Sequence, residues 1–140
     1  MKVTTVIAAR TSKVWPHLAD LSSHVEWMAD AEAIRFTTRQ RRGVGTTFEC
    51  DTKVGPLRLT DHMEVTEWEE GRLIGVRHHG LVTGTGRFSI EPLDGGEATA
   101  LTWEEDLALP WRLASPVLGA IWRRNLSRLK ARVESGTALG

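Results

Sequence analysis

Two-residue turn sequences that contain glycine recur along the chain between Ala33 and Leu109, and they restrict its fold more than any other feature. Between the turns, apolar and polar residues alternate, which is typical of strands with one buried face. Short turns of this kind join neighbouring antiparallel strands. The pattern therefore predicts a meander of antiparallel strands, with turns at Arg42-Gly43, Gly55-Pro56, Glu70-Gly71, His79-Gly80 and Gly95-Gly96.

The turn positions also indicate which residues lie opposite one another. In an antiparallel hairpin, directly opposed side chains share one face of the sheet. Turns centred on Gly55-Pro56, Glu70-Gly71 and Gly95-Gly96 pair Cys50 with Asp61, Met63 with His78, Phe88 with Trp103, and Gly86 with Glu105. The three hairpins thus place their apolar residues on one shared face, as a single sheet covered by one helix requires.

This shared face has two features of a cavity wall. Gly84 and Gly86 weaken a strand interior and signal a bend or the close approach of another group. Asp61, His78 and Glu105 lie among apolar neighbours, where an unpaired charge is costly. A hydrated cavity, or one that holds a partly polar ligand, explains both features. We therefore expect the cavity to be lined by Phe48, Cys50, Leu59, Met63, Val76, Gly84, Gly86, Phe88, Trp103, Glu105 and Trp122.

Helices are predicted on both sides of the meander. A first strand from Val3 to Ala8 precedes Thr11-Ser12, whose hydroxyls are suited to cap a first helix. Ser22-Ser23 ends this helix and can start a second short one. After Ser115-Pro116, apolar residues recur every three or four positions from Leu118 to Val133, which predicts a long amphipathic C-terminal helix.

Several segments carry a family resemblance: Val3-Thr4-Thr5-Val6, Val14 to Asp20, Trp27, Gly43-Val44-Gly45, Val65 to Arg72, Phe88 to Leu93, and Gly96 to Trp103. With these segments the chain resembles the START-related (SRPBCC) superfamily and, within it, the polyketide cyclase/dehydrase family. The resemblance implies an α+β helix-grip fold, in which a curved antiparallel seven-stranded β-sheet wraps around a long C-terminal α-helix, with two short helices between strands 1 and 2. It also implies a cavity for an apolar or aromatic small molecule, as in carriers, regulators and some cyclases. The family has no invariant catalytic set, so the resemblance assigns no active-site residue.

Length and composition describe a soluble globular protein. The 140 residues, of which 41% are hydrophobic and 26% charged, predict a single domain over residues 1–140. Eighteen basic and eighteen acidic residues give a net charge of zero, so nucleic acid is not an expected partner. No apolar window approaches about 18 residues and no signal core follows Lys2, which indicates a cytoplasmic protein.

Asp61 and His78 are the candidate catalytic pair. A carboxylate beside an imidazole fixes its tautomer and raises its pKa, which suits a general acid or base in aldol condensation, dehydration or enolisation. The alternative is a polar pair that satisfies itself in a hydrated cavity. Glu105 is expected to act separately and to hydrogen-bond a ligand hydroxyl. Three strand spacings of about 4.8 Å separate it from Asp61 on a flat sheet.

The remaining candidate groups predict no further chemistry. Cys50, the single cysteine, is interpreted as a small buried apolar residue, because nothing around it indicates a depressed pKa. His78 and His79 point to opposite faces of a strand and cannot chelate together. With no zinc motif and no dinucleotide-binding loop, we expect neither a metal nor a cofactor.

Three functions fit these observations. The first is a carrier of a small hydrophobic ligand, such as a lipid, a polyketide or another ring-containing metabolite. The second is a polyketide cyclase or dehydratase in which Asp61 orients His78. The third is a protein-interaction module that uses cations of the C-terminal helix, chiefly Arg123, Arg124 and Arg128. Membrane contact is less favoured. The apolar segment 107–113 is expected to form a lid, a membrane-touching loop or ordinary packing. The protein is expected to be a monomer or a homodimer.

Overall fold

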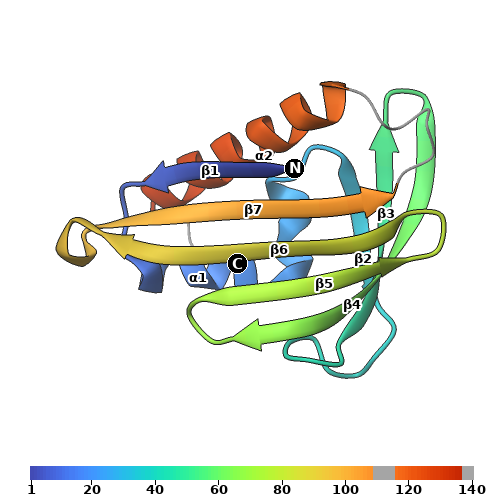
Figure 1. Ribbon diagram of the computed structural model, residues 1–140, viewed down its shortest axis with the longest axis horizontal. Coiled ribbons are helices and arrows are strands. Elements are labelled where there is room, and N and C mark those ends of the chain that lie inside the picture. Colours follow the sequence, from blue (N-terminus) through green and yellow to red (C-terminus); the bar gives the residue numbers. More distant parts are fainter. Residues whose placement is uncertain (109–115, 137–140) are drawn as a thin grey trace.

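A computed structural model describes residues 1–108 and 116–136 of the chain (Figure 1). The strands are β1 (Lys2–Ile7), β2 (Ala31–Phe36), β3 (Thr47–Val54), β4 (Leu57–Glu69), β5 (Leu73–His79), β6 (Thr83–Leu93) and β7 (Ala98–Ala108). The α-helices are α1 (Thr11–Ala19) and α2 (Pro116–Glu134), and the 3₁₀ helices are η1 (Leu21–Glu26) and η2 (Asp94–Gly96).

The strands form one antiparallel sheet in the order β1-β7-β6-β5-β4-β3-β2. Figure 1 shows β2 and β3 running steeply across the direction of β6 and β7, so the sheet is strongly curved. Helix α2 lies along the concave face of the sheet. In the sequence, α1 and η1 come after β1. The predicted α+β helix-grip fold, with seven strands and two short helices between the first two strands, is confirmed.

The hairpin registers predicted from the glycine turns are also confirmed. Cys50 pairs with Asp61, and Met63 pairs with His78. On the next hairpins, Phe88 pairs with Trp103 and Gly86 with Glu105. Because side chains in one register share a face, these pairs turn their side chains toward α2. The prediction of a shared inner face therefore holds across β3 to β7.

The helix starts differ from the sequence prediction. Helix α1 begins at Thr11 with Arg10 as its N-cap, and no side chain caps it. Thr11 lies inside the helix, so its hydroxyl is not the predicted cap. The second short helix is a 3₁₀ turn, and the Ser23 hydroxyl donates to Asp20 O at 2.7 Å within it. The predicted cap at Ser115 lies outside the described residues.

Only part of the inner face forms a packed core. Leu126, Leu129 and Val133 in the second half of α2 are buried in the core cluster, together with Ile7 of β1 and the fully buried Trp27. Leu118 and Trp122, in the first half of α2, instead line a cavity. The same helix therefore closes the core with one end and covers a cavity with the other.

Candidate functional site

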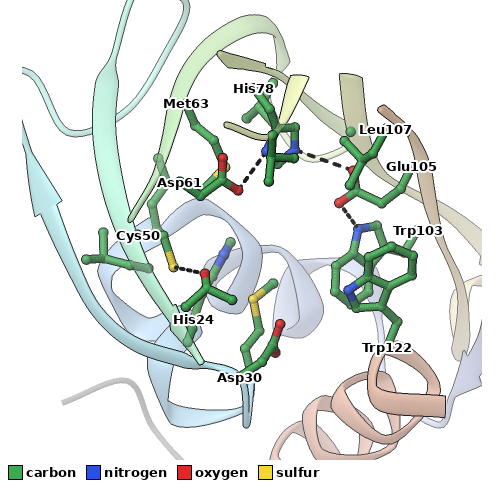
Figure 2. A pocket seen from close by; sticks show the side chains of 18 of the residues that line it. His24, Asp30, Cys50, Asp61, Met63, His78, Trp103, Glu105, Leu107 and Trp122 are labelled. Atoms are coloured by element: carbon green, nitrogen blue, oxygen red, sulfur yellow. Dashed lines mark hydrogen bonds and ion pairs between the residues drawn. The ribbon is translucent and has the colours of Figure 1, made fainter. Parts of the chain in front are cut away.

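The cavity lies between the curved sheet and the first half of α2 (Figure 2). Its volume is about 140 Å³. Its lining is mostly apolar, which favours a compact hydrophobic ligand. The lining includes these residues selected from the sequence: Phe48, Cys50, Leu59, Asp61, Met63, Val76, His78, Gly86, Phe88, Trp103, Glu105 and Trp122.

Gly84 is the one sequence-selected residue that does not line the cavity. Its φ of +125° lies in a region that L side chains rarely adopt, and a Cβ there would collide with the carbonyl oxygen of Asp106. The glycine therefore permits the close approach of β7 to β6. Its assignment to the ligand site is corrected to this backbone role.

Asp61 and His78 meet on the cavity wall as the hairpin register predicts. Asp61 is on β4 and lies diagonally across from His78 on β5, since Met63 is the direct partner of His78. His78 Nδ1 is 2.8 Å from Asp61 Oδ2, and the two side chains are 6% and 13% exposed. The ring is thus held by a buried hydrogen bond.

Glu105 joins this pair, which the sequence interpretation missed. Its Oε2 lies 3.4 Å from His78 Nε2, an ion-pair contact, and Trp103 Nε1 donates to its Oε1 at 2.8 Å. The contact crosses strand β6 at Gly86, where a Cβ would lie 2.5 Å from Glu105 Oε2. The expectation that Glu105 acts separately is therefore wrong, because a missing side chain and the curvature of the sheet let it reach His78.

Asp61, His78 and Glu105 together form a carboxylate–histidine cluster. Burial by itself lowers the pKa of His78, but the hydrogen bond to Asp61 and the neighbouring Glu105 carboxylate outweigh it and raise the pKa to about 9. His78 is therefore an imidazolium at neutral pH. In this state the ring is a proton donor, and the role of general base does not suit it.

Three atoms of the cluster have no hydrogen-bond partner within the described part of the chain. They are Asp61 Oδ1, His78 Nε2 and Glu105 Oε2. Buried polar atoms are nearly always hydrogen-bonded, and those left without a protein partner mark places for a ligand or an ordered water. The cluster is thus the polar end of an otherwise apolar cavity.

His24 and Asp30 are polar lining residues that were not selected from the sequence, as are Thr52 and Arg87. His24 is buried, its Nε2 lies 2.9 Å from Leu18 O, and burial lowers its pKa to about 4, so it is neutral. Asp30 accepts a bond of 2.7 Å from Asn125 Nδ2 on α2. The signal for this contact is Asn125 itself, a polar residue within the apolar stripe of the C-terminal helix.

Cys50 has the buried position that the sequence predicts. Its side chain is 6% exposed, and burial raises the pKa of its thiol to about 11. The Thr52 hydroxyl donates to Sγ at 3.7 Å. Because a nucleophilic cysteine must be a thiolate, this thiol serves as part of the wall.

Neither a metal-ligand cluster nor a membrane-spanning helix is found among residues 1–108 and 116–136. No cluster of three or more His, Cys, Asp and Glu side chains there has the geometry to hold a metal ion. His79, on the outer face, stacks on His62 with ring centroids 6.0 Å apart. None of the described helices is long and apolar enough to cross a membrane.

Some of the cations of the C-terminal helix form contacts within the molecule. Arg132 pairs with Glu26 at 3.0 Å, and Lys130 donates to the backbone oxygen of Val6 at 2.8 Å. These contacts attach α2 to η1 and β1. Residues 109–113 of the apolar segment 107–113, predicted as a lid, a membrane-touching loop or ordinary packing, lie outside the described residues.

Solved structures share this architecture. A START superfamily protein from Mycobacterium smegmatis is 19% identical and has a TM-score of 0.77, and the match covers 98% of each chain. The Zhui aromatase/cyclase from Streptomyces sp. R1128 is 20% identical with a TM-score of 0.74, and 99% of this chain matches 94% of that one. The di-domain aromatase/cyclase StfQ is 13% identical with a TM-score of 0.78, and 97% of this chain matches 45% of that one. At these identities the likeness shows a common fold.

The family comparison covers almost the whole chain. No curated protein sequence matches this one. The model of the family described as polyketide cyclase/dehydrase and lipid transport matches residues 1–134, which include every strand and both α-helices. The chain therefore belongs to the polyketide cyclase/dehydrase and lipid transport family.

Proposed function

We propose that this protein binds a compact, ring-containing hydrophobic ligand in the cavity, with the polar group of the ligand at the carboxylate–histidine cluster. The supporting observation is an apolar cavity with three buried polar atoms at one end that lack a hydrogen bond, two of which face each other in the 3.4 Å contact of Glu105 with His78. Aromatic side chains favour a ring, since Phe88 and Trp103 have centroids 5.0 Å apart and Trp122 lies 5.7 Å from Trp103. Family membership supports hydrophobic ligand binding or cyclase activity in general.

The neutral two-ring probe 2-naphthalenemethanol tests this proposal by isothermal titration calorimetry. Val76 lines the cavity opposite Gly86, and Val76→Trp is expected to weaken binding by at least about tenfold, because the larger indole occupies space that the rings of the ligand need. The matched control is Val6→Trp, at a strand position that is 50% exposed, which should bind like the wild type. Absence of binding by the wild type, or undiminished binding by Val76→Trp, would contradict the proposal.

A second candidate function is dehydration of a β-hydroxy ketone, favoured by the protonated ring of His78 facing the cavity between two carboxylates. In this reaction Glu105 Oε2 removes the α-proton, and the C–H electron pair forms the C=C bond as the C–O bond breaks. The hydroxyl leaves with the Nε2 proton of His78 as water. Glu105 then returns its proton to His78 across the 3.4 Å contact, which restores both groups.

His78→Gln is expected to reduce turnover of a β-hydroxy ketone substrate by about 100-fold or more, the usual contribution of general acid–base catalysis. Ligand binding should be retained, because glutamine keeps a polar group at the end of the cavity. His79→Gln is the matched control, since His79 lies next to it in sequence on the opposite face. Equal turnover by His78→Gln and the wild type would eliminate the dehydratase proposal and leave the binding proposal intact.

A further inference from the structure

The charges around the cavity do not balance. Asp61, Glu105 and Asp30 bring three carboxylates to the lining, and His78 brings one cation, which leaves two negative charges uncompensated among the described lining residues. Arg87 also borders the cavity, but its guanidinium bonds Glu67 at 2.6 Å on the outer face. Figure 2 shows Asp30 on the far side of the cavity from His78, so acidic groups face the ligand from both sides.

The buried atoms of the carboxylate–histidine cluster that lack a hydrogen bond also favour a donor with positive charge. Glu105 and His78 are 9% and 6% exposed. Asp61 Oδ1 is an acceptor without a donor, and Glu105 Oε2 has only the long 3.4 Å contact with His78 Nε2. A buried acceptor that stays unpaired costs about 1–3 kcal/mol. An ammonium group offers three N–H donors and a positive charge, whereas a carboxylate or phosphate brings only acceptors and more negative charge. The cluster is therefore suited to a cationic donor.

Two indole rings lie beside these carboxylates. The bond from Trp103 Nε1 to Glu105 fixes one ring, and the Trp122 ring lies 5.7 Å from it (Figure 2). A cation close to an indole face gains about 0.5–2 kcal/mol from the ring electrons. The neighbourhood of Glu105 thus combines negative charge with aromatic surface.

We propose that the cavity selects a hydrophobic amine, whose rings fill the apolar space and whose ammonium group donates to Asp61 Oδ1 and Glu105 Oε2. This inference rests on the proposed function, and it adds the chemical class of the ligand. A neutral alcohol pairs with one acceptor but leaves the charge uncompensated. A carboxylate of the same size can accept the His78 proton, but it adds to the two negative charges already uncompensated in the lining.

Three probes that differ only in their polar group test this selection. They are 2-naphthylmethylamine, 2-naphthalenemethanol and 2-naphthoate, titrated calorimetrically at pH 7 and low salt. The amine is expected to bind about tenfold more tightly than the alcohol, and the carboxylate about tenfold more weakly. Equal affinities, or tightest binding of the carboxylate, would overturn charge selection and leave the binding proposal standing. Failure of all three to bind would instead contradict the binding proposal.

Glu105→Gln examines the contact itself. Glutamine keeps the shape of the side chain and an oxygen for Trp103, but it removes one negative charge. The amine should lose at least about fivefold more affinity than the alcohol, because only the amine loses a charge contact while the amide still exchanges a hydrogen bond with a hydroxyl. The matched control is Glu104→Gln. Glu104 points to the other face of β7, where it is the strand-register partner of Arg87. Unchanged amine affinity in Glu105→Gln would overturn the proposal.

Discussion

Denaturant unfolding is expected to show the highest stability near pH 6.5 and a loss on the order of 3 kcal/mol between pH 6.5 and pH 9. The cause is His78, whose pKa is about 9 in the folded protein and about 6.5 in the unfolded chain. In this interval the folded state holds a proton that the unfolded state has released. The stability that this proton contributes is fully present below pH 6.5 and disappears as the pH rises through 9.

Below pH 6.5 the free energy of unfolding is expected to change with pH in the opposite direction. His24 is buried and neutral, and burial lowers its pKa to about 4, so the unfolded chain binds a proton before the folded protein does. Stability is therefore expected to fall as the pH decreases from 6.5 toward 4. Burial also lowers the pKa of His17, which acts in the same direction. The two limbs together place the maximum near pH 6.5.

Two histidine variants separate these effects. His78→Gln should flatten the limb between pH 6.5 and 9 and leave the acid limb in place. His79→Gln, on the outer face, should retain both limbs. The measurement is the free energy of unfolding in urea at closely spaced pH values. A wild-type profile that stays level from pH 6.5 to 9 would show that the cluster does not stabilise a protonated His78.

Gly86→Ala is expected to lower the free energy of unfolding at pH 7 by about 3 kcal/mol and to lower the pKa of His78. The added methyl would lie 2.5 Å from Glu105 Oε2, so Glu105 must leave its position beside His78. Glu105 is 9% exposed and bonded to Trp103, which leaves it little room to move. The variant therefore loses packing and a charge contact together.

Gly75→Ala is the matched control for this substitution. A Cβ at Gly75 would lie 2.7 Å from Oε1 of Glu67, a carboxylate that is 44% exposed and paired with Arg87. This variant should lose less stability, because the exposed carboxylate can move into solvent and the Cβ of Glu67, 3.0 Å from the added methyl, needs only a small shift. The NMR titration of His78 should be unchanged in Gly75→Ala and shifted to lower pH in Gly86→Ala. The same titration in both variants would mean that Glu105 does not act on His78.

The hairpin registers and the inner face could be predicted because they depend on local chemistry. Each turn sets the sum of the opposed residue numbers along its hairpin, although a β-bulge between Val65 and Glu67 shifts this sum by one near the turn between β4 and β5. The same rule places Asp61 diagonally opposite His78. It also placed Gly86 opposite Glu105, which was the available signal for the third member of the cluster.

The errors arose where a feature depends on three-dimensional shape. Counting strand spacings separates Glu105 from Asp61, but it ignores the curvature of the sheet and the gap that Gly86 leaves. The positive φ of Gly84 follows from the close approach of β7, which sequence alternation does not encode. The division of the inner face into core and cavity likewise depends on how α2 crosses the sheet. The helical spacing of apolar residues predicts the same buried environment for Leu118 and Leu126, although one lines the cavity and the other lies in the core.

A crystal structure with 2-naphthalenemethanol tests the binding site most directly. The predicted result is density for the two rings between the sheet and Trp122, with the hydroxyl within hydrogen-bond distance of His78 Nε2 or Glu105 Oε2. Density confined to the outer surface, or side chains that close the space between Asp61 and α2, would contradict the existence of a ligand cavity with this cluster at its polar end.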